Sequence, residues 1–208
     1  MDNRTEQLKK IKDEIVDTKN SPLYNFRIKN KFLPVIGEGS HYAKIMFIGE
    51  APGKNEALIG RPFCGAAGKI LDELLSSIGV DRKEVYITNV VKDRPPENRD
   101  PLPNEIEFYA PFLDRQIEII KPEIIVSLGR FSMTYIMKKF GLESELSARG
   151  GSAFGGKSIS QIHGKVFSTE TSYGKIKIIP LYHPAVALYG TNKEILKKDF
   201  EVLKEFVK

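Results

Sequence analysis

The chain has 208 residues, of which 41% are hydrophobic and 28% charged, as is typical of a soluble globular protein with one core. No run approaches the roughly 18 apolar residues that a membrane span requires, and the charged first ten residues lack the apolar segment of a signal peptide, so we expect a cytoplasmic protein. The net charge of +5 favours a polyanionic partner. The single cysteine excludes an internal disulfide, and with three scattered histidines we expect no metal site.

Apolar residues at helical spacing predict an amphipathic helix over residues 2–18 that covers the core. The sequence Ser21-Pro22 breaks this helix because proline cannot continue its hydrogen bonding. Residues 25–43 are basic and irregular, with room for a short edge strand.

The stretch from residue 45 to residue 68 organises the rest of the chain. It begins with a short apolar run, residues 45–48, that is typical of a buried strand in a parallel sheet. The following Glu50-Ala51-Pro52-Gly53 predicts a shaped loop, because proline lacks an amide donor and glycine permits positive φ. Helical spacing resumes near Ala67 and ends at Gly79. Loops at the carboxyl ends of parallel strands bind ligands, so this one is a candidate site; the alternative is a solvent-exposed Pro-Gly turn.

Strands and helices then alternate to the end of the chain. We expect strands at 85–91, 124–128 and 175–181, the last paired with 166–168, helices at 103–120, 130–140 and 193–207, a proline-rich surface loop at 92–101, and a mobile Gly- and Ser-rich insertion at 144–160. This order predicts an α/β fold, specifically a three-layer α/β/α sandwich with a mainly parallel central sheet of about four strands, in a single domain over residues 1–208.

Three of the predicted strands end in a distinctive polar residue. Glu50 follows the first, Asn89 closes the second and His183 follows the last. Because the carboxyl ends of parallel strands meet at one edge of a sheet, these side chains and Phe63 are expected to share one pocket. An amide can read the edge of a nucleobase, an aromatic ring can stack on it, a neutral imidazole can donate to a carbonyl oxygen that gains charge, and a carboxylate can position water.

The motifs that carry these residues resemble those of the uracil-DNA glycosylase superfamily, and most of all its family 4, the thermostable iron–sulfur type. They are, in this order, G-E-A-P-G-x-x-E, G-R-P-F-x-G-x-A-G, T-N-V-V-K-x-R-P-P-x-N-R-x-P, P-x-L-x-x-Q, S-L-G and Y-H-P-A, and the resemblance as a whole runs from about residue 18 to the C-terminus. The resemblance implies a DNA repair enzyme that flips uracil out of single- or double-stranded DNA and hydrolyses its N-glycosidic bond. The products would be an abasic site and free uracil, and the enzyme would act as a monomer.

By position, the resemblance implies a role for each motif residue. Phe63 would stack on the flipped uracil, Asn89 would read its polar edge and His183 would stabilise the departing base. Glu50 and Glu56 would lie on the side of the water and the sugar, and the backbone at Ala51 and Gly53 would line the pocket. For DNA, we expect Leu188 and Tyr189 to fill the gap left by the extruded nucleotide, and basic side chains to contact phosphates. The basic candidates are Lys54, Lys92, Arg94 and, above all, Arg99.

The departure from the family concerns its cofactor. Family 4 proteins hold a four-iron cluster with four cysteines, and the corresponding positions here are Thr18, Ser21, Asp93 and Tyr109, none of which supplies a thiolate. We therefore expect no cluster and no other cofactor. Cys64, in the pocket motif, is expected to serve packing.

Other interpretations stay open. Asn89 can cap a turn, His183 can be a structural histidine before proline and Glu56 can be a charge at a helix start. The chain can also be a glycosylase for another deaminated or oxidised base, or a non-catalytic DNA-binding relative of the fold.

Overall fold

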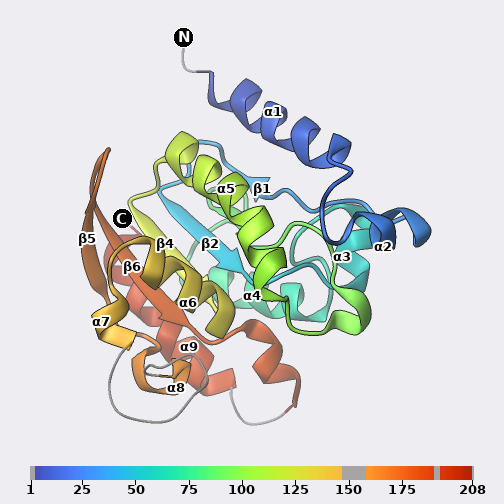
Figure 1. Cartoon of the computed structure of the whole chain (residues 1–208). Helices are drawn as coiled ribbons and strands as arrows, with labels where there is room; N and C mark the ends of the chain where they lie inside the picture. Colours follow the sequence, from blue (N-terminus) through green and yellow to red (C-terminus); the bar gives the residue numbers. More distant parts are fainter. Residues whose placement is uncertain (1–2, 147–157, 190–192, 208) are drawn as a thin grey trace.

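The computed structural model describes residues 3–146, 158–189 and 193–207, which form one sheet flanked by helices (Figure 1). The described strands are β1 (Glu38–Gly39), β2 (Ile45–Gly49), β3 (Tyr86–Asn89), β4 (Ile124–Leu128), β5 (Phe167–Thr171) and β6 (Gly174–Leu181). The α-helices are α1 (Arg4–Asp17), α2 (Tyr24–Lys29), α3 (Lys54–Ile59), α4 (Ala66–Ser77), α5 (Pro103–Ile120), α6 (Arg130–Lys139), α7 (Glu143–Leu146), α8 (Ile159–Ile162) and α9 (Lys193–Glu201). Short 3-10 helices are η1 (Pro96–Asn98), η2 (Pro184–Tyr189) and η3 (Val202–Phe206).

The sheet has the strand order β1-β3-β2-β4-β6-β5. Its four inner strands run parallel, whereas β1 and β5 pair antiparallel with the strands beside them. The expectation of about four mainly parallel strands is therefore corrected to a mixed sheet of six among the described residues. The two edge strands account for the difference. One has only two residues, and the other carries polar and partly exposed side chains that give a weak strand pattern.

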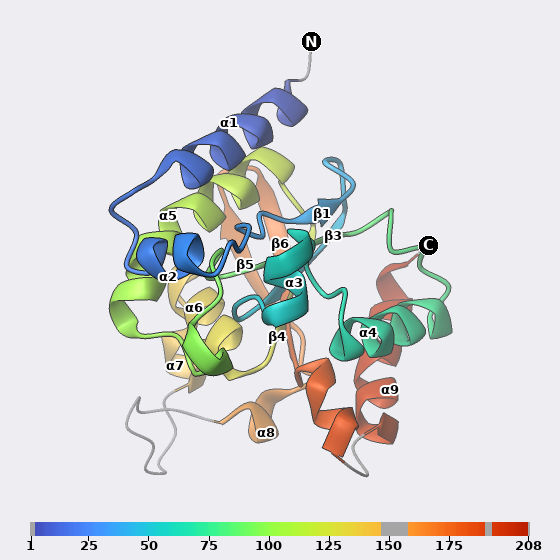
Figure 2. The same ribbon diagram turned by 90° about the vertical axis from the view of Figure 1, so that its right-hand side faces the viewer.

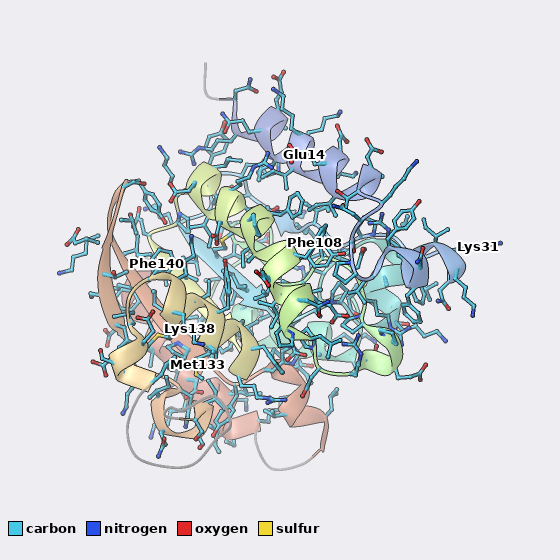
Figure 3. The ribbon with its side chains drawn as sticks, viewed as in Figure 1. Glu14, Lys31, Phe108, Met133, Lys138 and Phe140 are labelled. Carbon is cyan, nitrogen blue, oxygen red and sulfur yellow. The ribbon has the colours of Figure 1, made fainter. Side chains whose placement is uncertain are left out.

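Both faces of the sheet are covered, because successive side chains of a strand point to opposite faces. On β2, Met46 and Ile48 pack with α1, α5 and α6, whereas Ile45 and Phe47 pack with α4 and α9. Figure 2 shows these two helical layers on either side of the sheet. In Figure 3, Phe108 of α5 and Met133 of α6 lie in the first of these layers. The inner strands are buried on both faces, which is why they read as unbroken apolar runs.

Most of the predicted long elements are confirmed, as are the short edge strand expected within residues 25–43 (β1) and the strand expected at 166–168 (β5), whereas the short helices α2 and α3 were missed. Helices α1, α4, α5 and α6 and the four inner strands lie where helical spacing and apolar runs place them. Helices α2 and α3 have six residues each and bury a single side chain apiece, too little for a periodic pattern. Most of the insertion expected to be mobile lies outside the described residues, at 147–157; its flanks form α7 and α8. In the described part of the chain, every helix is too short or too polar to cross a bilayer.

Candidate active site

The ends of β2 and β3 meet at Gly49. Gly49 pairs in register with Asn89, and a Cβ atom added to Gly49 would lie 2.3 Å from Asn89 Oδ1 and 2.8 Å from Cζ of Phe63. Both distances are shorter than real Cβ contacts, so only glycine fits between the amide and the aromatic ring. The structure thus brings Asn89 and Phe63 together across the end of the central strand.

Phe63 is held in a demanding backbone conformation. Its φ angle of 47° lies in the left-handed region that residues with a side chain rarely adopt. Helix α4 approaches the Phe63 carbonyl so closely that a Cβ on Gly68 would lie 1.8 Å from that oxygen. The ring is 6% exposed, and its centroid lies 5.4 Å from that of His183. Phe63 therefore joins the β2 and β3 ends to the loop after β6.

His183 follows β6 and begins the turn into η2. Its Nδ1 accepts a hydrogen bond of 3.2 Å from the Ala185 backbone N–H, so in the neutral ring the proton sits on Nε2. Burial lowers the pKa of His183 to about 4, so the ring is neutral near pH 7. A Cβ on Gly129, at the end of β4, would lie 3.2 Å from the His183 Cβ, which makes this another strand end that needs glycine. His183 thus offers Nε2–H as a donor without a charge.

The Asn89 side chain has no hydrogen-bond partner among the described residues. Asn89 is 2% exposed, and no described residue hydrogen-bonds to its side-chain amide. The amide is not among the fully buried unpaired side-chain groups of the described chain, which are Ser127 Oγ and Tyr173 Oη, so it stays open to the space at the strand ends. An amide that is almost buried and has no protein partner can offer both its donor and its acceptor to a ligand. The amide of Asn89 is therefore the strongest sign of a ligand at this edge.

Glu50, the residue after Gly49, is a partly buried carboxyl group. Burial raises its pKa to about 7, with a further raising effect from the charge of Asp100 and a lowering effect from Arg130. Asp100 and Arg130 form an exposed ion pair with each other. A carboxyl group poised near neutral pH at a strand end is typical of proton-transfer chemistry.

Glu56 lies in the first turn of α3 and faces the Phe63 loop. Its Oε2 would lie 2.6 Å from a Cβ on Gly53, and its Oε1 would lie 3.5 Å from a Cβ on Gly65. Burial, followed by the charge of Glu56, raises the pKa of the Cys64 thiol. Ala51 is partly buried and packs against the core under α1, α5 and α6. The segment from Glu50 to Gly53 therefore lies beside the strand ends, and the Glu56 carboxylate lies close to Gly53 at the end of this segment.

The residues expected to contact DNA differ in how accessible their side chains are. Lys54 is exposed at the start of α3, and Leu188 in η2 is 45% exposed. Tyr189 closes η2, and its side chain lies outside the described part of the structure. Arg99 is held by a two-pronged pair with Glu105, with N–O distances of 2.6 and 2.9 Å. Its guanidinium therefore fixes the start of α5, and only its outer edge is open to DNA.

The expectation that Lys92 contacts phosphate is wrong. Lys92 is fully buried, and its amino group donates to three protein oxygens. A sequence pattern that places a lysine in a polar loop after a strand does not show that the side chain turns back inward. Arg94 also has a protein partner, because it donates to Asn98 Oδ1 at 2.7 Å.

Sequence reasoning missed Gly49, Asp100 and Arg130. Gly49 and Arg130 sit at or just after the ends of central strands, so the argument that selected Glu50 and Asn89 would have found them. Asp100 lies in the proline-rich loop, where no periodic pattern points to it.

A hollow of about 690 Å³ lies between α5 and α6, and Met133 and Lys138 of its lining are labelled in Figure 3. Its walls are mostly apolar and include Pro101, Ile106 and Phe131. It shares Arg130 with the surroundings of Glu50, but Glu50, Asn89 and His183 do not line it. We therefore do not assign it to the chemistry of the strand ends. Among the described residues, no three His, Cys, Asp or Glu side chains gather in a way that could hold a metal ion.

Comparison with known proteins agrees with this geometry. Residues 36–208 match the model of the Uracil DNA glycosylase superfamily, well over half of the chain. The chain belongs to the uracil DNA glycosylase superfamily. Its relatives include the type-4 uracil-DNA glycosylases of Sulfurisphaera tokodaii, 46% identical over 96% of this chain and 84% of the relative, and of Archaeoglobus fulgidus, 43% identical over 96% and 93%. The type-4 enzyme of Saccharolobus solfataricus is 46% identical over 94% and 84%.

These matches differ in what they cover at the N-terminus. The superfamily model begins at residue 36, just before β1, so it includes every strand end described above and leaves out α1 and α2. The type-4 uracil-DNA glycosylases cover nearly the whole chain. The N-terminal helices are therefore part of the similarity to the type-4 branch of the superfamily.

Proposed function

We propose that this protein is a monofunctional uracil-DNA glycosylase that extrudes uracil from DNA and hydrolyses its N-glycosidic bond, leaving an abasic site. The observation that carries the proposal is the Asn89 amide, which no described residue hydrogen-bonds, beside Phe63 and the neutral ring of His183. The type-4 names of the relatives support the choice of uracil as the base.

Cleavage of the bond leaves negative charge on the base and positive charge on the sugar. In the proposal, Phe63 stacks on uracil and the Asn89 amide pairs with its O4 and N3–H, while the Ala51 and Gly53 backbone lines the pocket. His183 Nε2–H donates to a carbonyl oxygen as charge develops there. A fixed neutral donor suits this role because its hydrogen bond strengthens as the anion forms.

The carboxylates act on the other side of the scissile bond. Ionised Glu50 orients a water molecule toward the sugar carbon and accepts its proton, while the departing uracil keeps the bonding electrons and takes a proton from solvent. Glu56 stabilises positive charge on the sugar. The pKa of Glu50, raised to about 7, is suited to a group that gains a proton in this step.

DNA binding is proposed to use the surface next to this edge. Lys54 and the outer edge of Arg99 contact phosphates, and Leu188 with Tyr189 fills the space of the extruded nucleotide. We propose that the protein acts as a monomer in the cytoplasm.

The test is excision from oligonucleotides that carry one lesion each, followed by alkaline cleavage of the abasic product. Uracil-containing single strands and duplexes should be cleaved, whereas a protein that binds but never cleaves would contradict the proposal. Cleavage only at hypoxanthine or at an oxidised pyrimidine would favour the alternative substrate class. Asn89→Asp sharpens the test, because replacing amide donors by carboxylate acceptors should shift selectivity toward cytosine, whose amino group donates.

We also propose that this protein works without the iron–sulfur cluster of family 4. The residues at the four cysteine positions do not fit a cluster, because they offer hydroxyl and carboxylate oxygens that are already hydrogen-bonded to one another or to nearby backbone. Ser21 Oγ lies 2.5 Å from Tyr109 Oη, and Tyr109 donates to Asp93 Oδ2 at 2.6 Å. Thr18 Oγ1 donates to the Glu14 carbonyl at 2.7 Å.

Arg27 completes this polar network. Its guanidinium is buried, pairs with Asp93 at 3.2 Å and donates to the carbonyls of Ile15, Val16 and Thr18 at 2.9 to 3.3 Å. The network joins three segments: the connection between α1 and α2, the loop after β3, and helix α5. A cluster would tie the same three segments together. Stoichiometric iron in the purified protein, with broad absorption in the blue, would contradict this proposal.

A further inference from the structure

Lys92 has a buried amino group that the proposed reaction does not use. It comes three residues after Asn89, and its side chain is fully buried. Its Nζ donates to Thr88 Oγ1 at 2.8 Å, to the backbone carbonyl of Asn89 at 2.7 Å and to Gln116 Oε1 at 2.6 Å. The side chain therefore turns back over the end of β3.

The three oxygens are committed to accepting from Lys92. Thr88 Oγ1 gives its own proton to the Ile36 carbonyl at 2.7 Å. The Gln116 amide nitrogen donates to the Ile36 carbonyl and to Tyr86 Oη, which fixes its Oε1 as the acceptor on the Lys92 side. An ammonium group has three protons, one for each acceptor. Burial lowers the pKa of Lys92 well below its ordinary value, and the three bonds stabilise the protonated form against this effect.

Stability alone does not explain such a residue. No carboxylate of the described chain pairs with Lys92, and desolvating an unpaired ammonium costs several kcal/mol. An apolar side chain of similar volume would avoid that cost.

The contact with Asn89 suggests what Lys92 does. The Asn89 side chain has no protein partner to set its direction, so its orientation depends on its backbone. The next amides, Val90 N–H and Val91 N–H, are held by the carbonyls of Gly49 and Glu50, each at 3.0 Å. Lys92 holds the carbonyl of Asn89 itself, so the peptide group that follows the Asn89 Cα is fixed through both its carbonyl and its N–H.

We propose that Lys92 is a positioning residue that aims the Asn89 amide at the extruded base by clamping the Asn89 carbonyl to Thr88 and Gln116. The inference rests on the proposed uracil excision. A displacement of about 1 Å in such a group can lower a rate about 10²-fold, because the productive geometry is lost. Lys92 touches neither the base nor the sugar in this proposal.

The test is a double-mutant cycle with Lys92→Met, which keeps the volume and removes the donors, and Asn89→Ala. Single-turnover uracil excision is measured at saturating protein, together with affinity for abasic-site DNA. Lys92→Met alone should lower the rate about 10²-fold with little change in affinity. In the Asn89→Ala background the same change should have no further effect, because the group that it positions is gone.

Tyr109→Phe is the matched control, because it also removes a buried hydrogen bond but lies in the Arg27 network. Its excision rate should equal that of the wild type at a temperature where both are folded.

If Lys92→Met does not fold, Thr88→Val and Thr88→Ser test the inference in its place. Thr88→Val removes one acceptor of the clamp and should slow excision, and Thr88→Ser should restore it. A wild-type rate in Lys92→Met or Thr88→Val, or an equal loss with and without Asn89, would overturn the inference. A wild-type protein that excises nothing would instead overturn the proposed function.

Discussion

Two groups of polar residues include residues at or just after the end of β3, and they differ in how their hydrogen bonds are satisfied. In the network of Ser21, Arg27, Asp93 and Tyr109, every side chain has a partner within the protein. At the strand ends, the Asn89 amide has no partner among the described residues, and burial lowers the pKa of His183 to about 4. One group is complete without a ligand and the other is not.

This difference separates stability from chemistry. A fully satisfied polar network rigidifies the fold, and removing one member leaves a buried group unpaired. Groups that are left for a ligand add little to the stability of the free protein and gain partners only when the substrate binds. We therefore expect changes in the Arg27 network to affect unfolding, and changes at the strand ends to affect excision.

The largest expected effect on stability comes from Arg27→Met. It leaves the Asp93 carboxyl buried without its cation and should lower the free energy of unfolding by about 3–5 kcal/mol. Denaturant unfolding measures the loss. Arg115→Met is the matched control, because the exposed pair of Arg115 with Glu14 should contribute only about 0–1 kcal/mol. Equal losses in the two variants would contradict the account of the network.

Gly49→Ala should act in the opposite way, on the rate. The new Cβ must displace Asn89 Oδ1 or the Phe63 ring, and excision should fall about 10²-fold because the pocket groups move from their positions. Gly79→Ala is the control. Its Cβ would meet no atom within 4 Å, so that variant should lose about 1–2 kcal/mol of stability from its positive φ and keep its rate. Full activity in Gly49→Ala would show that the pocket does not depend on this contact.

The pH dependence of excision should follow Glu50. If the ionised carboxylate orients the water, the rate rises with pH through about 7, the raised pKa of this group. Asp100→Asn removes a charge that raises the pKa, so the rise should move to lower pH; Arg130→Gln removes a charge that lowers it, so the rise should move to higher pH. Shifts in the same direction for both variants, or a profile that Glu50→Gln leaves unchanged, would exclude this role.

The smallest effect concerns DNA affinity. Lys54→Ala should weaken binding to all DNA sequences alike. It should also reduce the slope of log affinity against log salt concentration by about the amount expected for the loss of one phosphate contact. Titrations with undamaged duplex at several salt concentrations measure this slope. A slope unchanged from the wild type would remove Lys54 from the DNA surface.

The sequence predicts the strand-end residues because a parallel sheet places them. Once β2, β3 and β6 are recognised from apolar runs, Glu50, Asn89 and His183 must lie at one edge, and the contact between Phe63 and His183 agrees with this. The directions of side chains are not contained in that argument. Lys92 and Arg99 read as free cations in a polar loop, yet one folds into the core and the other pairs with Glu105.

The fold is predictable to a similar depth. Long helices and buried strands carry periodic patterns, whereas α2, α3 and β1 are too short to show one. The polar network shows the same limit. Ser21, Asp93 and Tyr109 are far apart in the sequence, and nothing in their spacing says that they hydrogen-bond.

One pair of variants tests the separation of stability from chemistry most directly: His183→Ala and Tyr109→Phe, each measured for single-turnover uracil excision and for free energy of unfolding. His183→Ala should lose about 10²–10³-fold in rate, the usual effect of removing one such donor, with unfolding close to the wild type. Tyr109→Phe should lose about 1–3 kcal/mol of stability and keep its rate while folded. If the rate falls in both variants, or if His183→Ala cleaves like the wild type, the account is contradicted.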